Sequence, residues 1–203
     1  MTIALIEDDE AVLHSLRLLL QNRGFAVNGF KSVEAFLASP HAKSSACIVS
    51  DVRLPGKSGV DLQRLLKAKG VATPIILITG HGDIAMAVTA MREGAYDFIE
   101  KPYDAERLIA SIERTLATNQ RLKSLESEKQ LLSQRAAELS PRQRQVMELV
   151  AAGLSSKQIA SRLGISHRTV ENYRAWIMER MDASNVAELV RKVLILETGT
   201  TSK

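Results

Sequence analysis

Short apolar runs alternate with amphipathic stretches through about the first 117 residues of the chain. The apolar runs have the length of buried strands and lie at 3–6, 26–30, 46–50, 75–79 and 96–99. Between them, apolar residues recur every three or four positions, as at Val12, Leu16 and Leu19, which is typical of a helix with one buried face. Strands that alternate with helices predict an α/β fold built on a parallel sheet.

The pattern changes beyond residue 104, where no further strand is predicted. Residues 105–138 contain neither Gly nor Pro and predict one continuous helix. Four leucines along this stretch keep a partial heptad spacing, namely Leu122, Leu125, Leu132 and Leu139. Lys129 and Ala136 interrupt that spacing, so the pattern leaves open both a weak coiled coil and a helix packed against its own domains.

A compact group of short helices is predicted from residue 139 onward. Ser140 and Pro141 read as an N-cap followed by a proline at the first helical position, and Gly153 and Gly164 mark turns between helices. The tail at 198–203 is expected to be disordered. We therefore divide the chain into an α/β domain at 1–118, a helical linker at 119–138, an all-α domain at 139–197 and the tail.

Charge separates the two predicted domains. The chain of 203 residues has a formal net charge of +4, which divides into −1 over residues 1–120 and +5 over residues 121–203. A basic second half favours a polyanionic partner for that half. The single cysteine excludes an intramolecular disulfide and a cysteine zinc cage. No membrane-spanning run or signal-peptide pattern is present, so we expect a cytoplasmic protein without a membrane partner.

Polar and charged residues stand at the carboxyl ends of four predicted strands. They are Glu7 and Asp8 after the first strand, Asp51 after the third, Thr79 at the end of the fourth and Lys101 after the fifth. In an open parallel sheet, these strand ends form the ligand-binding edge. Each residue alone is more simply a helix cap, a turn former or a surface residue. Together, and in this order, they predict a carboxylate that accepts a phosphoryl group.

Asp51 is the predicted phosphoacceptor. Neighbouring carboxylates repel one another unless a cation compensates them, and Mg²⁺ prefers oxygen ligands. The expected Mg²⁺ ligands are Glu7, Asp8, Asp51 and the backbone carbonyl of Arg53. The Asp51 carboxylate would act as the nucleophile. Lys101 and the Thr79 hydroxyl would bind the non-bridging oxygens of the resulting acyl phosphate.

Four segments resemble the receiver domain of two-component response regulators. They are Ile-Glu-Asp-Asp at 6–9, Ser-Asp-Val-Arg-Leu-Pro-Gly at 50–56, Thr-Gly-His-Gly-Asp at 79–83 and Phe-Ile-Glu-Lys-Pro at 98–102. The resemblance covers residues 1–118 and implies a five-stranded, doubly wound, flavodoxin-like sheet, with Mg²⁺-dependent transfer from a sensor histidine kinase to Asp51. It also implies a cis peptide bond before Pro102 and a switch pair of Thr79 and Phe98. Glu7 and Phe98 depart from the commoner Asp and Tyr.

A helix, a tight turn and a second helix are predicted between residues 156 and 181, a geometry that lays the second helix in the major groove of DNA. That helix, at 166–181, would turn Val170, Tyr173 and Ile177 toward the domain core. Its other side offers candidate DNA contacts at Arg168, Thr169, Glu171, Asn172 and Arg174. Lys157 suits a phosphate. A helical bundle that merely exposes its charges to solvent fits the same pattern.

Three segments of the second half resemble the LuxR-type helix-turn-helix, namely 139–147, 153–160 and 163–171. The run at 187–191 and the Gly-His-Gly-Asp run at 80–83 are similar to the FixJ branch of the NarL/FixJ family. This resemblance covers residues 138–197. It implies DNA contacts at Lys157, Thr169, Glu171, Asn172 and Arg174. Gln143 and Tyr173 depart from the usual Glu and His of the signature.

The two resemblances together imply a phosphorylation-dependent transcription regulator of a two-component system. Phosphorylation of Asp51 is expected to produce a homodimer that binds promoter DNA, with RNA polymerase as a further partner. We expect no enzyme activity beyond the receiver's own phosphoryl transfer and autodephosphorylation. One rival is an aspartyl-phosphate hydrolase resembling the haloacid dehalogenases, which needs an acid where Arg53 stands. Another is a scaffold that acts through the helix at 105–139 without DNA.

Overall fold

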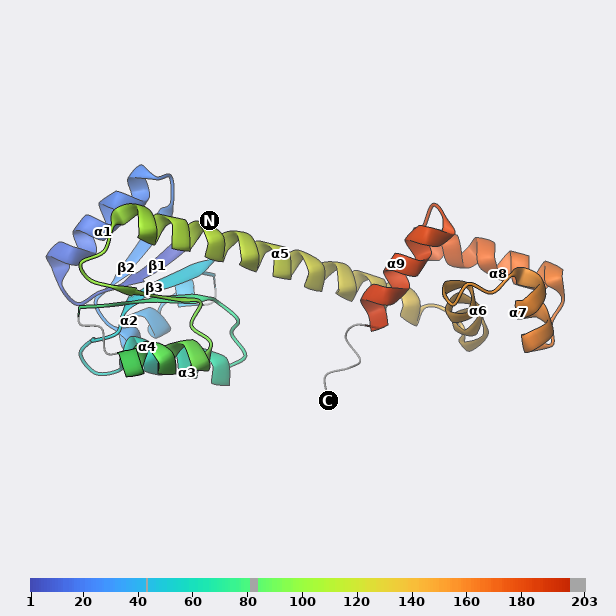
Figure 1. The fold of residues 1–203 in the computed structure, drawn as a ribbon, viewed down its shortest axis with the longest axis horizontal. Coiled ribbons are helices and arrows are strands. Elements are labelled where there is room, and N and C mark those ends of the chain that lie inside the picture. Colours follow the sequence, from blue (N-terminus) through green and yellow to red (C-terminus); the bar gives the residue numbers. More distant parts are fainter. Residues whose placement is uncertain (43, 81–83, 198–203) are drawn as a thin grey trace. The chain divides into compact units, whose positions relative to one another are not determined.

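The computed structural model describes residues 1–203 except 43, 81–83 and 198–203, so the predicted tail lies outside the described residues (Figure 1). The chain divides into two compact units, Met1–Leu122 and Lys123–Lys203. The boundary falls within helix α5 (Ala105–Ala137), which joins the two units. Within the described part of the chain, no helix is long and apolar enough to cross a membrane.

The first unit is built on a five-stranded parallel sheet with the strand order β2-β1-β3-β4-β5. Its strands are β1 (Thr2–Ile6), β2 (Ala26–Phe30), β3 (Cys47–Asp51), β4 (Ile75–Thr79) and β5 (Asp97–Glu100). The register pairs Ile6 with Ser50 and Asp51 with Ile78. The central strands therefore end at nearly the same level, and the residues that follow them meet at one edge of the sheet.

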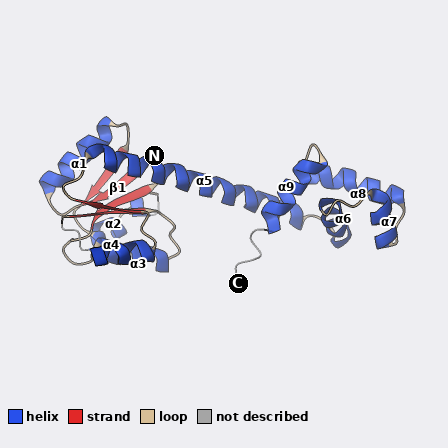
Figure 2. Ribbon diagram, in the orientation of Figure 1, coloured by secondary structure: helices blue, strands red, loops and turns tan. Residues whose placement is uncertain are grey.

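Helices cover both faces of the sheet (Figure 2). They are α1 (Glu10–Asn22), α2 (Val33–Ala38), the 3₁₀ turn η1 (Pro40–Ala42), α3 (Gly59–Ala68), α4 (Ile84–Glu93) and the first part of α5. One face, with Leu5 and Val49, packs against α1 and α5; the other, with Ile6 and Ile48, packs against α2, α3 and α4. Successive strand residues point to opposite faces, so a sheet covered twice needs continuous apolar strands. The predicted doubly wound fold is confirmed.

Among its described residues, the second unit contains helices and turns but no strand. It contains α6 (Pro141–Ala151), α7 (Ser156–Leu163), α8 (His167–Arg180) and α9 (Val186–Glu197), together with the last turns of α5. Ser140, Ser155 and Ser166 cap three of these helices by accepting hydrogen bonds from backbone N–H groups three residues on. Gly164 adopts a left-handed conformation (φ 64°) and makes the tight turn between α7 and α8.

The predicted linker does not behave as a uniform connector. Leu132 and Leu139 are buried in the core of the second unit, whereas Leu122 and Leu125 are exposed. Two of the four heptad leucines thus pack inside their own unit rather than forming a continuous seam. The end of the predicted linker contributes to the core of the all-α unit, because the buried side of α5 continues past residue 131 into that unit.

Candidate functional site

Asp51 lies at the end of β3 and is the centre of a convergent charged group. The Lys101 Nζ donates to Asp51 Oδ2 at 2.6 Å and to Glu7 Oε2 at 2.8 Å, and so bridges the two acids. The backbone N–H of Arg53 donates to the other Asp51 oxygen, Oδ1, at 2.8 Å. Asp51 and Glu7 are 8% and 3% exposed. Three residues from the ends of three strands therefore meet in a nearly dry site.

Burial and charge act against each other at this site. Burial raises the pKa of Glu7, and the hydrogen bond and charge of Lys101 offset this only in part, so the net pKa is raised. Burial lowers the pKa of Lys101, but Asp51 and Glu7 outweigh it, so that pKa is also raised. Lys101 therefore stays protonated at neutral pH. One cation faces two acids, which leaves an excess of negative charge.

The donor chemistry of the site fits a hard cation. Glu7, Asp51 and the Arg53 carbonyl supply oxygen ligands of the kind Mg²⁺ prefers, and the excess negative charge favours binding. Asp8 follows directly but is exposed. Among the residues that the structure describes, no three His, Cys, Asp or Glu side chains form a ready metal-holding group. Asp8 must therefore turn toward Asp51 if it is to serve as a ligand.

Thr79 and Phe98, the predicted switch pair, lie on the adjacent strands β4 and β5. Thr79 is buried at the end of β4, and its carbonyl accepts a 2.6 Å hydrogen bond from the Lys101 N–H. Phe98 is half-buried and packs against the core on the α3/α4 side of the sheet. The Lys101–Pro102 peptide bond is cis, as the resemblance implied. The next motif residues after Gly80, at 81–83, lie outside the described residues.

Gly59 is a site residue that the sequence analysis missed. A Cβ there would lie 2.5 Å from the Asp51 carbonyl oxygen and 2.8 Å from Leu77 Cδ2. Only glycine lets the start of α3 pack this closely behind Asp51. Ser58 and Asp61 fix the same turn through a reciprocal capping box. A Ser-Gly pair just before a helix, a few residues after Asp51, was the signal available in the sequence.

The candidate DNA contacts lie on α7 and α8. Val170 and Ile177 bury the inner side of α8. On the outer side, Arg168, Glu171 and Asn172 are exposed, whereas Thr169 and Arg174 are half-buried. The remaining candidate, Lys157, is exposed in the first turn of α7.

Two of these candidates also have local partners. The Thr169 hydroxyl hydrogen bonds to Ser166 Oγ at 2.8 Å at the helix cap. Glu171 lies 3.9 Å from His167 Nε2 on the preceding turn. Glu171 therefore lies on the side of α8 that carries His167.

Family models match both units. Residues 3–113 match the response regulator receiver domain, and residues 137–193 match the luxR family of bacterial regulatory proteins. The chain belongs to the NarL/FixJ family of response regulators, with a receiver domain followed by a LuxR-type DNA-binding domain. Proteins with this composition are DNA-binding transcription regulators of two-component systems, and this chain is one of them.

Individual relatives agree along nearly the whole chain. The transcriptional regulatory protein FixJ of Bradyrhizobium diazoefficiens is 46% identical over 93% of this chain and 92% of its own length. FixJ of Azorhizobium caulinodans is 44% identical over 95% of this chain and 92% of its own length. Among solved structures, the response regulator StyR is 38% identical with a TM-score of 0.83, covering 95% of this chain and 98% of its own. Full-length FixJ from B. japonicum is 44% identical with a TM-score of 0.62, covering 97% of each chain.

Proposed function

We propose that Asp51 accepts a phosphoryl group from a sensor histidine kinase and that this modification controls binding of the second unit to promoter DNA. One observation carries the proposal: a nearly buried aspartate at a strand end is bridged to a second buried acid by one lysine. A structural ion pair needs one acid for one base. The additional acid supplies the negative charge and the oxygen ligand that favour binding of a cation.

The transfer follows from the positions of the Asp51 oxygens. A carboxylate oxygen of Asp51 attacks the phosphorus of the kinase's phosphohistidine, the P–N bond breaks, and the imidazole nitrogen leaves with the electron pair. Lys101 and the Thr79 hydroxyl bind the phosphoryl oxygens. Glu7, Asp8, Asp51 and the Arg53 carbonyl would hold Mg²⁺, which offsets negative charge as the phosphoryl group approaches.

Phosphorylation acts on the rest of the receiver through Thr79. Its hydroxyl moves toward the new phosphoryl oxygens, and the space it leaves lets Phe98 turn inward from its half-buried position on β5. The surface of α4 and β5 changes as a result, and two receivers pair through it. A homodimer then presents two DNA-binding domains to two half-sites of a promoter, where RNA polymerase is the further partner.

The DNA contacts are proposed from the outer side of α8. Arg168 and Asn172 suit guanine and adenine edges, and Glu171 accepts from cytosine or rejects other bases. Thr169 and Arg174 border this surface, and Lys157 binds a phosphate. A protein with these roles would act in the cytoplasm, where the DNA is.

Turnover of the acyl phosphate is not the proposed task. Response regulators are signalling proteins, and Arg53 stands where an aspartyl-phosphate hydrolase needs its second acid. We assign to the chain only its own Mg²⁺-dependent phosphoryl transfer and autodephosphorylation. A scaffold that functions without DNA is disfavoured by the luxR family match over residues 137–193.

Phosphorylation of the purified full chain with acetyl phosphate and Mg²⁺ tests the acceptor. We expect one hydroxylamine-labile phosphate per chain, its loss in Asp51→Asn, and its retention in Asp61→Asn, a carboxylate of the neighbouring helix α3. Labelling of Asp51→Asn at the wild-type rate would refute the assignment.

A further inference from the structure

The last turns of α5 are an integral part of the second unit. Leu132 is 3% exposed and lies in the core that contains Val146, Val170 and Ile177. Close by, Glu138 forms an ion pair with Arg180 on α8. Helix α5 begins in the receiver. Its final turns pack against α8, the helix that carries most of the proposed DNA contacts.

The carboxyl end of α8 has an unusual residue at its turn. Met181 is the C-cap, and Asp182 follows with φ 52°, the only positive φ of a non-glycine residue within the described ranges. The left-handed region is disfavoured for residues with a Cβ, and helices commonly end with glycine at this position. Aspartate is one of the few other residues that adopt this conformation, so what its carboxylate contacts here is informative.

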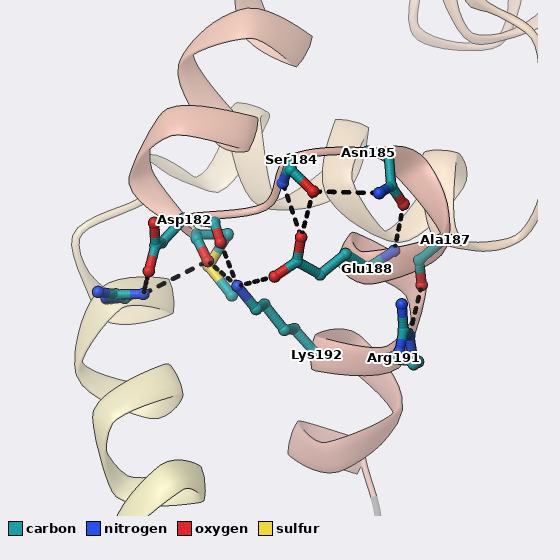
Figure 3. Close-up of polar contacts among 9 residues, drawn as sticks. Asp182, Ser184, Asn185, Ala187, Glu188, Arg191 and Lys192 are labelled. Atoms are coloured by element: carbon teal, nitrogen blue, oxygen red, sulfur yellow. Dashed lines mark hydrogen bonds and ion pairs between the residues drawn. The ribbon is translucent and has the colours of Figure 1, made fainter.

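Two cations from different helices converge on this end of α8 (Figure 3). Arg135 on α5 donates through Nη1 to Asp182 Oδ2 at 3.2 Å and to the Met181 carbonyl at 3.5 Å. Lys192 on α9 donates through Nζ to the Met181 carbonyl at 3.2 Å and to the Asp182 carbonyl. Positive charge at a helix carboxyl end is favourable, because the last carbonyls are otherwise unsatisfied.

The two cations differ in what they link. Lys192 also pairs with Glu188 at 2.9 Å, and Glu188 accepts hydrogen bonds from the Ser184 N–H at 2.8 Å and its hydroxyl at 2.6 Å, so this network is local to the turn between α8 and α9. Arg135 is the cation that comes from α5. Its link to Asp182 uses the one side chain that a glycine would lack.

We propose that Arg135 and Asp182 are positioning residues for DNA recognition: their ion pair ties the last turns of α5 to the carboxyl end of α8 and sets the orientation of α8 in the groove. The proposal rests on the DNA-binding function and adds to it the contact through which the connecting helix holds α8. The Arg135–Asp182 ion pair thus acts as a strut between the end of α5 and the end of α8.

The molecule contains a reporter of this strut. Trp176 is the only tryptophan in the chain, lies on α8 and is 38% exposed. It lines a surface groove together with Leu131, Gln134, Arg135, Glu138 and Arg180. The Arg180 guanidinium lies 5.7 Å from the centroid of its ring. A shift of α8 against α5 changes the solvent and charge around the indole, and so its fluorescence.

The test compares Asp182→Gly, Arg135→Gln and the double variant in the full chain, with Lys123→Gln as an exposed control earlier on α5. Affinity is measured at one fixed salt concentration for a duplex that the wild-type protein selects from a random library, and for a scrambled duplex. Melting temperature and Trp176 emission are recorded in parallel. Asp182→Gly is the decisive variant, because glycine suits the left-handed turn and removes only the carboxylate.

We expect each single variant to bind the selected duplex about two- to five-fold more weakly, the range expected of a partly exposed ion pair. The double variant should be no weaker than either single variant, because both remove the same pair. Asp182→Gly should melt at or above the wild-type temperature, and Trp176 emission should shift in all three variants. Lys123→Gln should behave as wild type.

The opposite results separate two failures. Wild-type affinity and emission in Asp182→Gly would refute the strut and leave DNA recognition intact, as would an equal loss on the selected and scrambled duplexes. A wild-type protein that selected no duplex at all would refute DNA recognition, and with it the strut.

Discussion

Two glutamates, one in each unit, show how differently the receiver and the DNA-binding domain use charge. Burial raises the pKa of Glu7, with Lys101 opposing it. Glu188 is half-buried at the start of α9, and hydrogen bonds from Ser184, followed by that of Lys192, lower its pKa to about 2. In the receiver, burial holds charged groups in a nearly dry site at a cost to stability. In the DNA-binding domain, charge stabilises the turns that hold a recognition surface.

The two regions also differ in how they assemble. Glu7, Asp51 and Lys101 come from the ends of different strands and are joined only by the sheet. The proposed DNA contacts all lie within α7 and α8 and remain solvent-accessible or half-buried. The predicted phosphoacceptor site thus depends on long-range folding of the receiver, whereas the proposed DNA contacts depend on two neighbouring helices. Substitutions confined to one unit should therefore leave the other unit unchanged.

The largest expected effect is on the core of the second unit. Leu132→Ala should destabilise that unit by about 2–5 kcal/mol, because it removes a fully packed side chain. The receiver should melt unchanged. Differential scanning calorimetry separates the two transitions, and Leu131→Ala, which removes a side chain of a residue that is 48% exposed, is the matched control. An equal loss in both transitions would show that the two units are not separate folding units.

Gly59→Ala should affect the opposite unit. Its Cβ would press on the Asp51 carbonyl oxygen, so we expect a loss of about 1–3 kcal/mol in the receiver transition and slower phosphorylation by acetyl phosphate. The DNA-binding domain should retain its melting temperature and its affinity. Gly70→Ala is the control in the same unit: it strains a left-handed turn (φ 66°) that has open space around it, so it should lower receiver stability but leave phosphorylation unchanged. Unchanged stability and phosphorylation in Gly59→Ala would contradict the close packing behind Asp51.

Asn172→Ala and Lys157→Ala should separate base contact from phosphate contact. Asn172→Ala should cost about 1–3 kcal/mol on the selected duplex and relax its sequence preference at one position. Lys157→Ala should weaken binding to every sequence and reduce the salt dependence by about one phosphate contact. Affinities across a salt series provide both quantities. If Asn172→Ala lost the same affinity for the selected and the scrambled duplex, Asn172 would not be a base contact.

The smallest effect concerns pH. The folded pKa of Glu188 is about 2, below its ordinary value of 4.5. The ionised carboxylate therefore stabilises the fold fully above pH 4.5, and this stabilisation is lost as the pH falls toward 2. Glu188→Gln should lower the melting temperature of the second unit at neutral pH, with the difference shrinking in acid. The pH dependence from Glu7 has the opposite sign. Its contribution to folding stability is fully present at low pH and is lost as the pH rises through its raised pKa. A pH-independent difference in Glu188→Gln would contradict the hydrogen-bond assignment.

Much of the fold follows from local patterns in the sequence. Apolar runs and helical spacing predicted the parallel sheet, because strands covered on both faces cannot alternate with polar residues. The position of these residues at strand ends was enough to group Glu7, Asp51 and Lys101. Their phosphoryl-transfer roles stay predictions.

Other features depend on which partner a side chain finds. The helical period of α5 does not show that Leu132 packs in the second unit while Leu122 stays exposed. Nor does the identity of Asp182 reveal a left-handed turn bonded to Arg135, since aspartate is common in ordinary turns. Gly59 was missed because its requirement comes from the Asp51 backbone rather than from its own conformation.

The most direct measurement is the affinity of the full chain for its selected duplex with and without acetyl phosphate and Mg²⁺, in wild type and Asp51→Asn. The account predicts a gain of about 5- to 150-fold on phosphorylation, the usual range of coupling between two sites, and no gain in Asp51→Asn. Equal affinity of the phosphorylated and unphosphorylated wild-type protein would contradict it.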